Sequence, residues 1–335
     1  MQNEFNAGIV GLGTYVPERV LTNLELESML ETSDEWIRSR TGIKERRIAA
    51  PEQASSDLAF EAARLALENG KVSADEVDLI VCTTLSPDML FPATGCIVQD
   101  RLGSKKAAAF DLEAGCSGFI YGLAVAQAFI TSGIYKTVLV IGTDVMSRMV
   151  NWKERDTCVL FGDGAGAVVV KPVESDQGIL SVHLGSDGSG ADTLLVPAGG
   201  SRMPFSQETL DRNLQYIHMN GGEVFKFAVK AMCNATKQVL DDAGLKQEDI
   251  DFLVPHQANT RIIESAAKRL KLPLEKVVVT VDRYGNNSTA SVPLALEEAV
   301  KDGRIKDGHN IVLVGFGAGL TWGAVAIRWG SPASL

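Results

Sequence analysis

Paired metal-ligand motifs are missing from this sequence. Its four histidines form no H-E-x-x-H pattern, and none lies near a cysteine at a spacing typical of zinc sites. The five cysteines include no C-x-x-C pair and are scattered along the chain, at Cys82, Cys96, Cys116, Cys158 and Cys233. An odd number of widely spaced cysteines is typical of a reducing compartment. We therefore expect no metal site.

An excess of basic residues is also missing. The formal net charge is -10 and the pI is near 5.0, so the chain as a whole does not attract phosphate backbones, and we expect no nucleic-acid partner. Residues 1–6 lack the basic and apolar regions of a signal peptide, which favours the cytoplasm. Residues 114–135 carry no charge, but their polar side chains and glycines favour a buried central helix over a membrane span.

The 335 residues, 45% of them hydrophobic and 22% charged, are typical of an ordinary α/β protein. Residues 77–81 and 250–254 both read as buried strands, and Asp78 and Asp251 are 173 positions apart. Strands at 138–142 and 311–315 have the same offset, since Gly142 and Gly315 are also 173 positions apart. Two strand pairs at one offset indicate an internal duplication. We expect two similar halves, 1–172 and 173–335, related by a pseudo-twofold axis.

Cys116 lies between an expected strand at 107–112 and an apolar helix at 119–130. A thiol beside a helix N-terminus is close to unsatisfied N–H groups and to the positive end of the helix dipole. We therefore expect a lowered pKa and a nucleophilic role for Cys116. The alternative is a buried structural cysteine.

Two polar residues follow strands in the second half. His256 comes directly after a strand at 252–254, and Asn286 follows an expected strand at 277–282. Open α/β sheets bind ligands beyond the carboxyl ends of their strands, so both residues are candidates for the same site as Cys116. Each alone fits a structural histidine or a turn asparagine equally well. The glycine-rich segment 315–319 is either an oxyanion-binding turn or a tight hairpin.

The motifs around these residues together resemble the β-ketoacyl-acyl-carrier-protein synthase III family over nearly the whole chain. They are Gly-Cys-Ser-Gly-Phe at Cys116, Val-Pro-His-Gln-Ala-Asn at His256, Tyr-Gly-Asn-Asn-Ser-Thr-Ala-Ser-Val-Pro at Asn286, and Phe-Gly-Asp-Gly-Ala-Gly at 161–166. The set of Cys, His and Asn differs from the Cys, His, His of elongating condensing enzymes and from thiolases, which carry a second cysteine.

The resemblance implies a thiolase-like fold of the α/β class, with two duplicated βαβαβαββ halves in a five-layered α-β-α-β-α arrangement. Residues 1–172 would carry the nucleophile, and 173–335 would carry the histidine and asparagine. It also implies a homodimer without a cofactor that joins an acyl-CoA to malonyl-acyl carrier protein by decarboxylative Claisen condensation. The products would be 3-oxoacyl-acyl carrier protein, CoA and CO2, in the first condensation of type II fatty acid synthesis.

The resemblance further implies roles for individual residues. Cys116 would form the acyl-enzyme, His256 and Asn286 would donate hydrogen bonds to the malonyl thioester oxygen, and the N–H groups of Cys116 and Ala318 would hold the acyl oxyanion. CoA would contact Thr32, Trp36, Arg40, Arg155 and Asn259. The acyl pocket would include Phe91, Met219 and Phe316. The carrier protein would dock on one helix face, at Arg261, Lys268 and Arg269, which otherwise reads as a solvated surface.

Four positions depart from the usual family pattern. Ala318 stands where the family usually has glycine, Asn287 where it has threonine, and Gly115 and Ser117 where it has alanines. Two other functions remain open at this point. One is a related acyltransferase or ketide-forming synthase of secondary metabolism, and the other is a non-enzymatic partner subunit, against which the presence of Cys116 argues. The starter acyl group is also open, because it depends on Phe91, Met219 and an expected surface insertion at 185–213.

Overall fold

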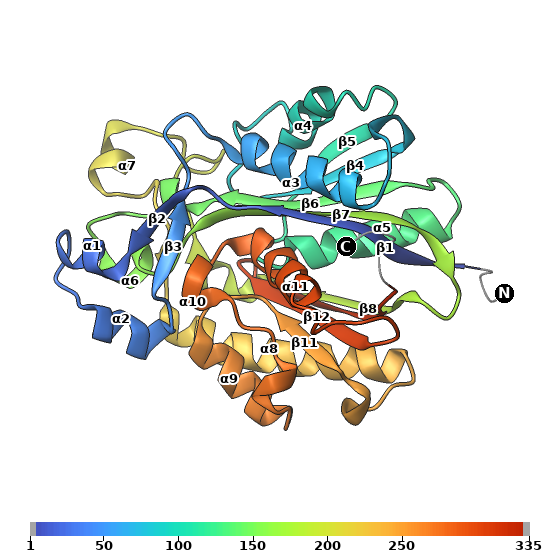
Figure 1. The fold of residues 1–335 in the computed structure, drawn as a ribbon. Helices are drawn as coiled ribbons and strands as arrows, with labels where there is room; N and C mark the ends of the chain where they lie inside the picture. The colour runs from blue at the N-terminus through green and yellow to red at the C-terminus, as the bar shows by residue number, and fades with distance from the viewer. Residues whose placement is uncertain (1–4, 331–335) are drawn as a thin grey trace.

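Two stacked β-sheets, with helices between and outside them, form the framework of the chain (Figure 1). The computed structural model describes residues 5–330. The first sheet has the order β1-β7-β6-β4-β5 and the second the order β11-β12-β13-β8. The first consists of β1 (Phe5–Tyr15), β4 (Leu79–Thr83), β5 (Ala108–Leu112), β6 (Val138–Val145) and β7 (Asp163–Glu174). The second consists of β8 (Gly178–Ser186), β11 (Phe252–Pro255), β12 (Asn310–Gly317) and β13 (Thr321–Arg328).

The two sheets repeat one pairing pattern. In the first, β4 is parallel to β6, β6 is antiparallel to β7, and β7 is antiparallel to β1. In the second, β11 is parallel to β12, β12 is antiparallel to β13, and β13 is antiparallel to β8. This repetition supports the expected duplication. Because β7 continues to Glu174 and β8 begins at Gly178, we propose that the halves divide in the turn between these strands, slightly after residue 172.

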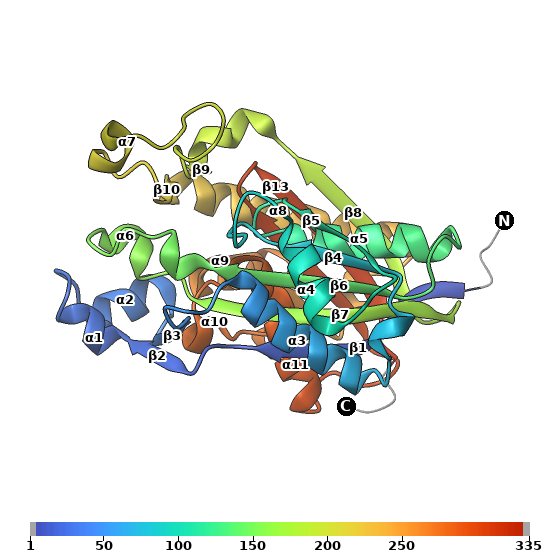
Figure 2. The same cartoon turned by 90° about the horizontal axis from the view of Figure 1, so that it is seen from above.

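Helices complete the five layers (Figures 1 and 2). Helices α5 (Gly118–Thr131) and α11 (Ser291–Lys301) lie between the sheets and pack against strands of both. Helices α3 (Ser55–Asn69) and α4 (Thr94–Leu102) cover the outer face of the first sheet. Helices α8 (Gly221–Asp242) and α9 (Thr260–Arg269) cover the second sheet. The α-β-α-β-α arrangement predicted from the sequence is confirmed.

The sequence of each helix matches its layer. Helix α5 carries no charged residue, and Phe119, Ile120 and Leu123 are completely buried between the sheets. Outer helix α8 is amphipathic instead, with a buried face that includes Met232 and Val239 and an exposed face that carries its lysines. The uncharged stretch at 114–135 is therefore the central helix of the core, as predicted.

The expected strand at 277–282 is wrong. Only Val277 forms an isolated bridge, to Leu253, and the chain turns into the short helix α10 (Val281–Tyr284). The side chain of Gln257 takes the place of a neighbouring strand: its Oε1 accepts the N–H groups of Thr280 at 2.8 Å and Val281 at 3.1 Å. An apolar, β-branched segment thus satisfies its backbone with one amide side chain instead of a ladder.

The remaining elements of the described residues are short strands, short helices and 3-10 turns. Strands β2 (Arg19–Thr22) and β3 (Glu45–Ile48) form a ribbon, and β9 (Leu194–Leu195) pairs with β10 (His218–Met219). The short helices are α1 (Asn23–Glu27), α2 (Asp34–Thr41), α6 (Arg155–Cys158) and α7 (Gln207–Asp211). The 3-10 turns are η1 (Ala74–Glu76), η2 (Met146–Arg148), η3 (Gly188–Thr193), η4 (Gln247–Asp249), η5 (Leu274–Lys276) and η6 (Ser288–Ala290). The expected insertion at 185–213 contains η3, β9 and α7 and projects at one end of the molecule (Figure 2).

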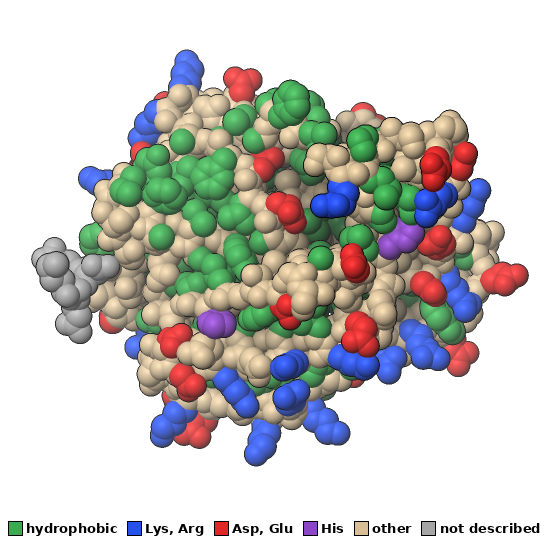
Figure 3. Space-filling view, turned by 180° about the vertical axis from the view of Figure 1, so that it is seen from behind, with side chains coloured by type: hydrophobic (Ala, Val, Ile, Leu, Met, Phe, Trp, Pro, Cys, Tyr) green, Lys and Arg blue, Asp and Glu red, His purple; other side chains and the backbone are tan. Residues whose placement is uncertain are grey.

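The surface is uneven in character. Figure 3 shows hydrophobic side chains gathered over the upper part of one face, and lysine and arginine side chains along its lower edge. The most exposed large hydrophobic residues are Leu90, Phe91, Leu24, Ile134 and Phe205. Among residues 5–330, no helix is long and apolar enough to cross a membrane, and no cluster of three or more His, Cys, Asp or Glu side chains is arranged to hold a metal ion.

Candidate active site

Cys116 lies in the turn between β5 and α5, as the sequence predicted, and only 5% of it is exposed. Two glycines allow the turn between β12 and β13 to approach it. A Cβ atom on Gly317 would lie 2.3 Å from the Cys116 nitrogen, and Gly115, at φ +56°, has the Ala318 backbone against it. The two N–H groups expected to hold an oxyanion, those of Cys116 and Ala318, therefore belong to segments in direct contact.

The expected lowering of the Cys116 pKa is wrong for this structure. Burial raises the pKa of Cys116 to about 12, and the field of Asp144 acts in the same direction. Hydrogen bonding from Ser288 and from the backbone of Cys116 lowers it, but by less. The loss of hydration thus outweighs the position beside a helix N-terminus. The resting side chain is therefore a neutral thiol.

His256 follows β11 and is 1% exposed. Its backbone N–H donates to the carbonyl of Val314 at 2.7 Å, and its Nδ1 lies 2.6 Å from the hydroxyl oxygen of Ser291. The ring of Phe316 packs edge-on against the imidazole, with centroids 5.1 Å apart. Burial lowers the pKa of His256 to about 3, so the imidazole is neutral at ordinary pH. The Ser291 hydroxyl also lies 2.9 Å from the carbonyl oxygen of Ser288 and has one proton for the two acceptors. When that proton goes to Nδ1, Nε2 carries the ring proton and is a hydrogen-bond donor.

Asn286 is held by its backbone and by one side of its amide. Its N–H donates to Leu160 at 2.8 Å, and its carbonyl accepts from Gly162 at 3.0 Å. Its Oδ1 accepts the N–H of Ser288 at 2.9 Å, which orients the amide. The Nδ2 group is then the part of Asn286 left to donate to a ligand.

Cys116, His256 and Asn286 line one cavity of about 120 Å³. Its other lining residues are mainly hydrophobic and come from both halves of the chain: Leu160, Phe161, Leu194, Met219, Val224, Phe225, Phe227, Ile262, Phe316 and Leu320. Met219 and Phe316 therefore lie where an acyl pocket was expected. Phe91 does not line this cavity, and 83% of it is exposed.

The residues expected to contact CoA lie together at one side of the cavity. The Arg155 guanidinium stacks on the Trp36 ring, 4.7 Å from its centroid, and also donates to the carbonyl of Glu31 at 2.8 Å. Asn259 lines the cavity, caps α9 and donates to the carbonyl of Arg40 at 3.1 Å. The buried Thr32 hydroxyl has no hydrogen-bond partner among the described residues.

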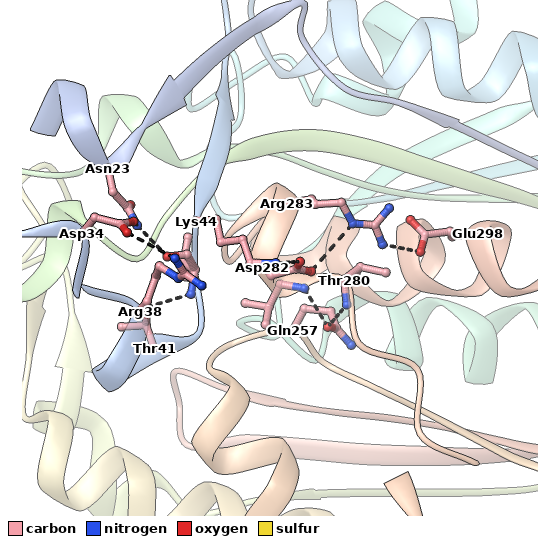
Figure 4. A network of polar contacts seen from close by, with 12 residues as sticks. Asn23, Asp34, Arg38, Thr41, Lys44, Gln257, Thr280, Asp282, Arg283 and Glu298 are labelled. Carbon is pink, nitrogen blue, oxygen red and sulfur yellow. Dashed lines mark hydrogen bonds and ion pairs between the residues drawn. The ribbon is translucent and has the colours of Figure 1, made fainter. Parts of the chain in front are cut away.

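Polar contacts hold this side of the molecule against the second half (Figure 4). Lys44, just beyond α2, pairs with Asp282 of α10 at 3.1 Å, and within the second half Arg283, next to Asp282, pairs with Glu298 of α11. Within the N-terminal flank, Asp34 accepts hydrogen bonds from Asn23 at 2.8 Å and from Arg38 at 3.3 Å. These contacts fix α2, which carries Trp36 and Arg40, relative to the cavity.

The three basic residues predicted for carrier docking are exposed on α9, and the opposite face of this helix is buried, as expected. Arg261 lies closest to the cavity, with its guanidinium 5.9 Å from the ring of Phe225, a lining residue. Lys268 and Arg269 lie in the last turn of α9.

Sequence reasoning missed the residues that hold His256 and Asn286. Ser291 contacts His256, Ser288 contacts Asn286, and Gln257 supports the segment before Asn286. All three occur within the motifs around His256 and Asn286. The presence of small polar residues in otherwise buried motifs is the feature that points to them.

Comparisons with known proteins agree with this geometry. Family models described as 3-oxoacyl-[acyl-carrier-protein (ACP)] synthase III and its C-terminal part match residues 110–188 and 240–329. A β-ketoacyl-[acyl-carrier-protein] synthase III from Caldanaerobacter subterraneus subsp. tengcongensis is 59% identical over 98% of this chain and 99% of its own.

Solved structures give the same result. The 3-oxoacyl-[acyl-carrier-protein] synthase III of Aquifex aeolicus VF5 is 47% identical, with a TM-score of 0.90 over 96% of this chain and 100% of its own. The priming β-ketosynthase of the R1128 polyketide pathway is 35% identical, with a TM-score of 0.91 over 99% of this chain and 98% of its own. The chain therefore belongs to the β-ketoacyl-[acyl-carrier-protein] synthase III family of thiolase-fold condensing enzymes.

Proposed function

We propose that Cys116, His256 and Asn286 are the catalytic residues of this enzyme. As a member of its family, the chain is an acyltransferase that joins an acyl-CoA starter to malonyl-acyl carrier protein in the first condensation of type II fatty acid synthesis. The observation that carries the assignment of residues is their convergence on one largely hydrophobic cavity from distant parts of the chain.

In the first half-reaction, the Cys116 sulfur attacks the acyl-CoA carbonyl. The S–H bond breaks as the new thioester forms, and CoA leaves as a thiol with that proton. The N–H groups of Cys116 and Ala318 hold the carbonyl oxygen while it is negatively charged. A dry cavity suits this chemistry, because water would hydrolyse the acyl-enzyme.

In the second half-reaction, the malonyl group loses CO2 and becomes an enolate. Nδ2 of Asn286 and Nε2 of His256 donate to the thioester oxygen on which charge develops. The enolate carbon then attacks the acyl-Cys116 carbonyl, and the thiolate is expelled and takes up a proton from solvent. No step needs an imidazolium or a cofactor, so we propose that the enzyme works without one.

We also propose that CoA binds beside α2, with its adenine between Trp36 and Arg155 and its remaining groups near Thr32, Arg40 and Asn259. In the present geometry the Arg155 guanidinium occupies the face of Trp36 that a base would stack on, so binding would separate the two side chains. Before CoA binds, the hydrogen bond from Arg155 to the carbonyl of Glu31 holds the stacked pair in place.

The acyl-enzyme provides the most direct test. Intact-protein mass spectrometry after incubation with a panel of acyl-CoAs should show a mass gain that malonyl-acyl carrier protein removes, and the acyl group retained best identifies the starter. Cys116→Ala should show no gain, whereas Cys96→Ala, which changes an exposed cysteine, should behave like the wild type. Arg155→Ala should need higher acyl-CoA concentrations. An acyl adduct on the Cys116→Ala protein would exclude Cys116 as the nucleophile.

Decarboxylation should depend on the other two residues. Asn286→Ala and His256→Ala should lower the release of CO2 from malonyl-acyl carrier protein about 100-fold or more, because each removes a donor to the enolate. Because the pKa of His256 is lowered to about 3, protonation of this residue should not change the wild-type rate between about pH 5 and 8. A rate that follows a group titrating near pH 6.5 would contradict a neutral donor.

We propose that the chain forms a homodimer in which a second copy associates along β5. This strand forms an edge of the first sheet, its residue Phe110 is partly exposed, and Leu90 and Phe91 nearby are more than four-fifths exposed. Unpaired edges and exposed hydrophobic groups favour association. In this homodimer, Phe91 would line the acyl pocket of the other subunit.

The homodimer can be tested by light scattering. The wild type should have twice the mass of the chain at micromolar concentration, and Phe110→Lys should shift it towards the monomer because a charge would be buried at the interface. Leu274→Lys, a matched change at a residue 52% exposed on η5, should leave the mass unchanged. A monomeric wild type, or dissociation by both substitutions, would contradict the proposal.

We propose that the carrier protein docks on the exposed face of α9. An enzyme with a net charge of -10 needs a local basic surface for an acidic partner, and Arg261, Lys268 and Arg269 form no ion pair with a described residue. Arg261 also lies next to the cavity through its contact with Phe225.

Reversing the charge of the exposed face of α9 should affect the reaction with malonyl-acyl carrier protein but not the reaction with acyl-CoA. Arg261→Glu combined with Lys268→Glu should raise the KM for malonyl-acyl carrier protein about tenfold at low salt, with acyl-CoA acylation unchanged. The control Lys306→Glu changes an exposed lysine on another part of the surface and should leave both values unchanged. An unchanged KM in the double variant would place the docking surface elsewhere.

A further inference from the structure

The turn between β12 and β13 carries one of the two N–H groups proposed to hold the acyl oxyanion. The last paired residues of these strands are Gly317 and Thr321, so the ladder of the sheet does not reach Ala318. At the end of the turn, Leu320 exchanges two backbone hydrogen bonds with Asp187, at 2.8 Å and 2.9 Å. The position of Ala318 therefore depends on contacts other than the ladder.

Two hydroxyl groups lie between this turn and the turn that holds Cys116. The Thr321 hydroxyl oxygen is 2.9 Å from the carbonyl oxygen of Ala318 and 2.8 Å from that of Ala114, two residues before the cysteine. The Ser117 hydroxyl is completely buried and lies 2.9 Å from the Thr321 hydroxyl and 2.7 Å from the carbonyl of Ala114. Side chains from both halves of the chain thus meet beside the nucleophile.

The number of protons limits how these contacts can be used, because each hydroxyl donates only one. If each donated to the carbonyl of its own turn, the oxygens of Ser117 and Thr321 would face each other at 2.9 Å with no proton between them. Such a contact between lone pairs is unfavourable. When Ser117 donates to Thr321 instead, the Thr321 proton goes to Ala318 or to Ala114. In either case the two side chains form one hydroxyl chain that joins the turns.

The hydroxyl chain acts where the two turns are in closest contact. A Cβ atom on Gly115 would lie 2.8 Å from the Ala318 nitrogen, and one on Gly317 would lie 2.3 Å from the Cys116 nitrogen. Two N–H groups hold an oxyanion well only when both are directed at the position that its oxygen will occupy. A shift of one turn relative to the other therefore changes the site that the two N–H groups form.

We propose that Ser117 and Thr321 are positioning residues for acylation. Their hydroxyl chain keeps the N–H groups of Cys116 and Ala318 at the separation that the acyl oxyanion requires. Neither side chain lines the cavity, and neither gains or loses a proton in the reaction. The inference rests on the proposed function, in which Cys116 is the nucleophile and these two N–H groups hold the carbonyl oxygen.

Single-turnover acylation by acyl-CoA, followed by intact-protein mass spectrometry, tests the role of Thr321. Thr321→Val keeps the shape of the side chain but removes its hydroxyl. It should lower the maximal acylation rate about tenfold and leave the half-saturating acyl-CoA concentration unchanged, because the oxyanion exists only during the reaction. Thr321→Ser keeps a hydroxyl and should restore most of the rate. Thr131→Val removes a hydroxyl that donates to the carbonyl of Gln127 at the far end of α5, and this control should react like the wild type.

A double substitution tests whether the two hydroxyls act as one chain. Ser117→Ala should slow acylation about threefold, and adding it to Thr321→Val should cause no further loss, because Ser117 acts through Thr321. Losses that multiply in the double variant would mean that each hydroxyl serves only its own turn, and would overturn the proposal.

Decarboxylation separates positioning of the oxyanion site from a general loss of structure. CO2 release from malonyl-acyl carrier protein without acyl-CoA depends on His256 and Asn286, so it should stay within about twofold of the wild type in all these variants. Unchanged acylation by Thr321→Val, a Thr321→Ser protein as slow as Thr321→Val, or an equal loss of decarboxylation would overturn the proposal while Cys116 remains the nucleophile. A wild type that forms no acyl-enzyme would instead refute the proposed function, and this inference with it.

Discussion

The exclusion of water from the layer between the two sheets is the constraint on which the rest of the structure depends. The inner faces of both sheets are hydrophobic, so exposing either of them to water would be unfavourable. The uncharged helix α5 and helix α11 fill the space between them. Both sheets must therefore face the same helices, which brings the end of β5 near the ends of β11 and β12. The active site forms where these strand ends meet, at the border of the core.

The same burial determines the chemistry of the site. It raises the pKa of Cys116 and lowers that of His256, so both side chains are neutral at rest. A neutral pair costs little to bury, whereas a thiolate and imidazolium would need strong compensation. In the mechanism proposed above, the site compensates only when charge develops, with donors on Asn286, His256 and the turn at Ala318. Electrostatic preorganisation in a largely hydrophobic cavity then replaces a permanently charged nucleophile.

The two halves of the chain differ in one segment of the repeat, the one that precedes the candidate catalytic residue. The first sheet has a fifth strand, β5, that leads into the nucleophile, whereas the corresponding segment of the second half, 277–280, is not a strand. There Gln257 binds the backbone and lets the chain turn early into α10. This departure from the repeat places Asn286 in the lining of the same cavity as Cys116 instead of at a second copy of the same turn.

The sequence by itself determined the layers and the duplication, and it indicated the residues proposed to carry the chemistry. Hydrophobic periodicity located β4, β6 and α5 to within a few residues, and the motifs around Cys116, His256 and Asn286 indicated one condensing site. These features are local, because strand and helix patterns and turn chemistry depend on neighbours in the chain.

Only the tertiary structure decided the burial of Cys116 and therefore the direction of its pKa shift. It also decided the loss of the expected strand at 277–282 and the exposure of Phe91 away from the cavity of its own chain. Each of these depends on groups far apart in the sequence, such as Gly317 against Cys116 or Asp144 against Thr289. Solvation and electric field are set by all the atoms around a residue, and no local pattern encodes them.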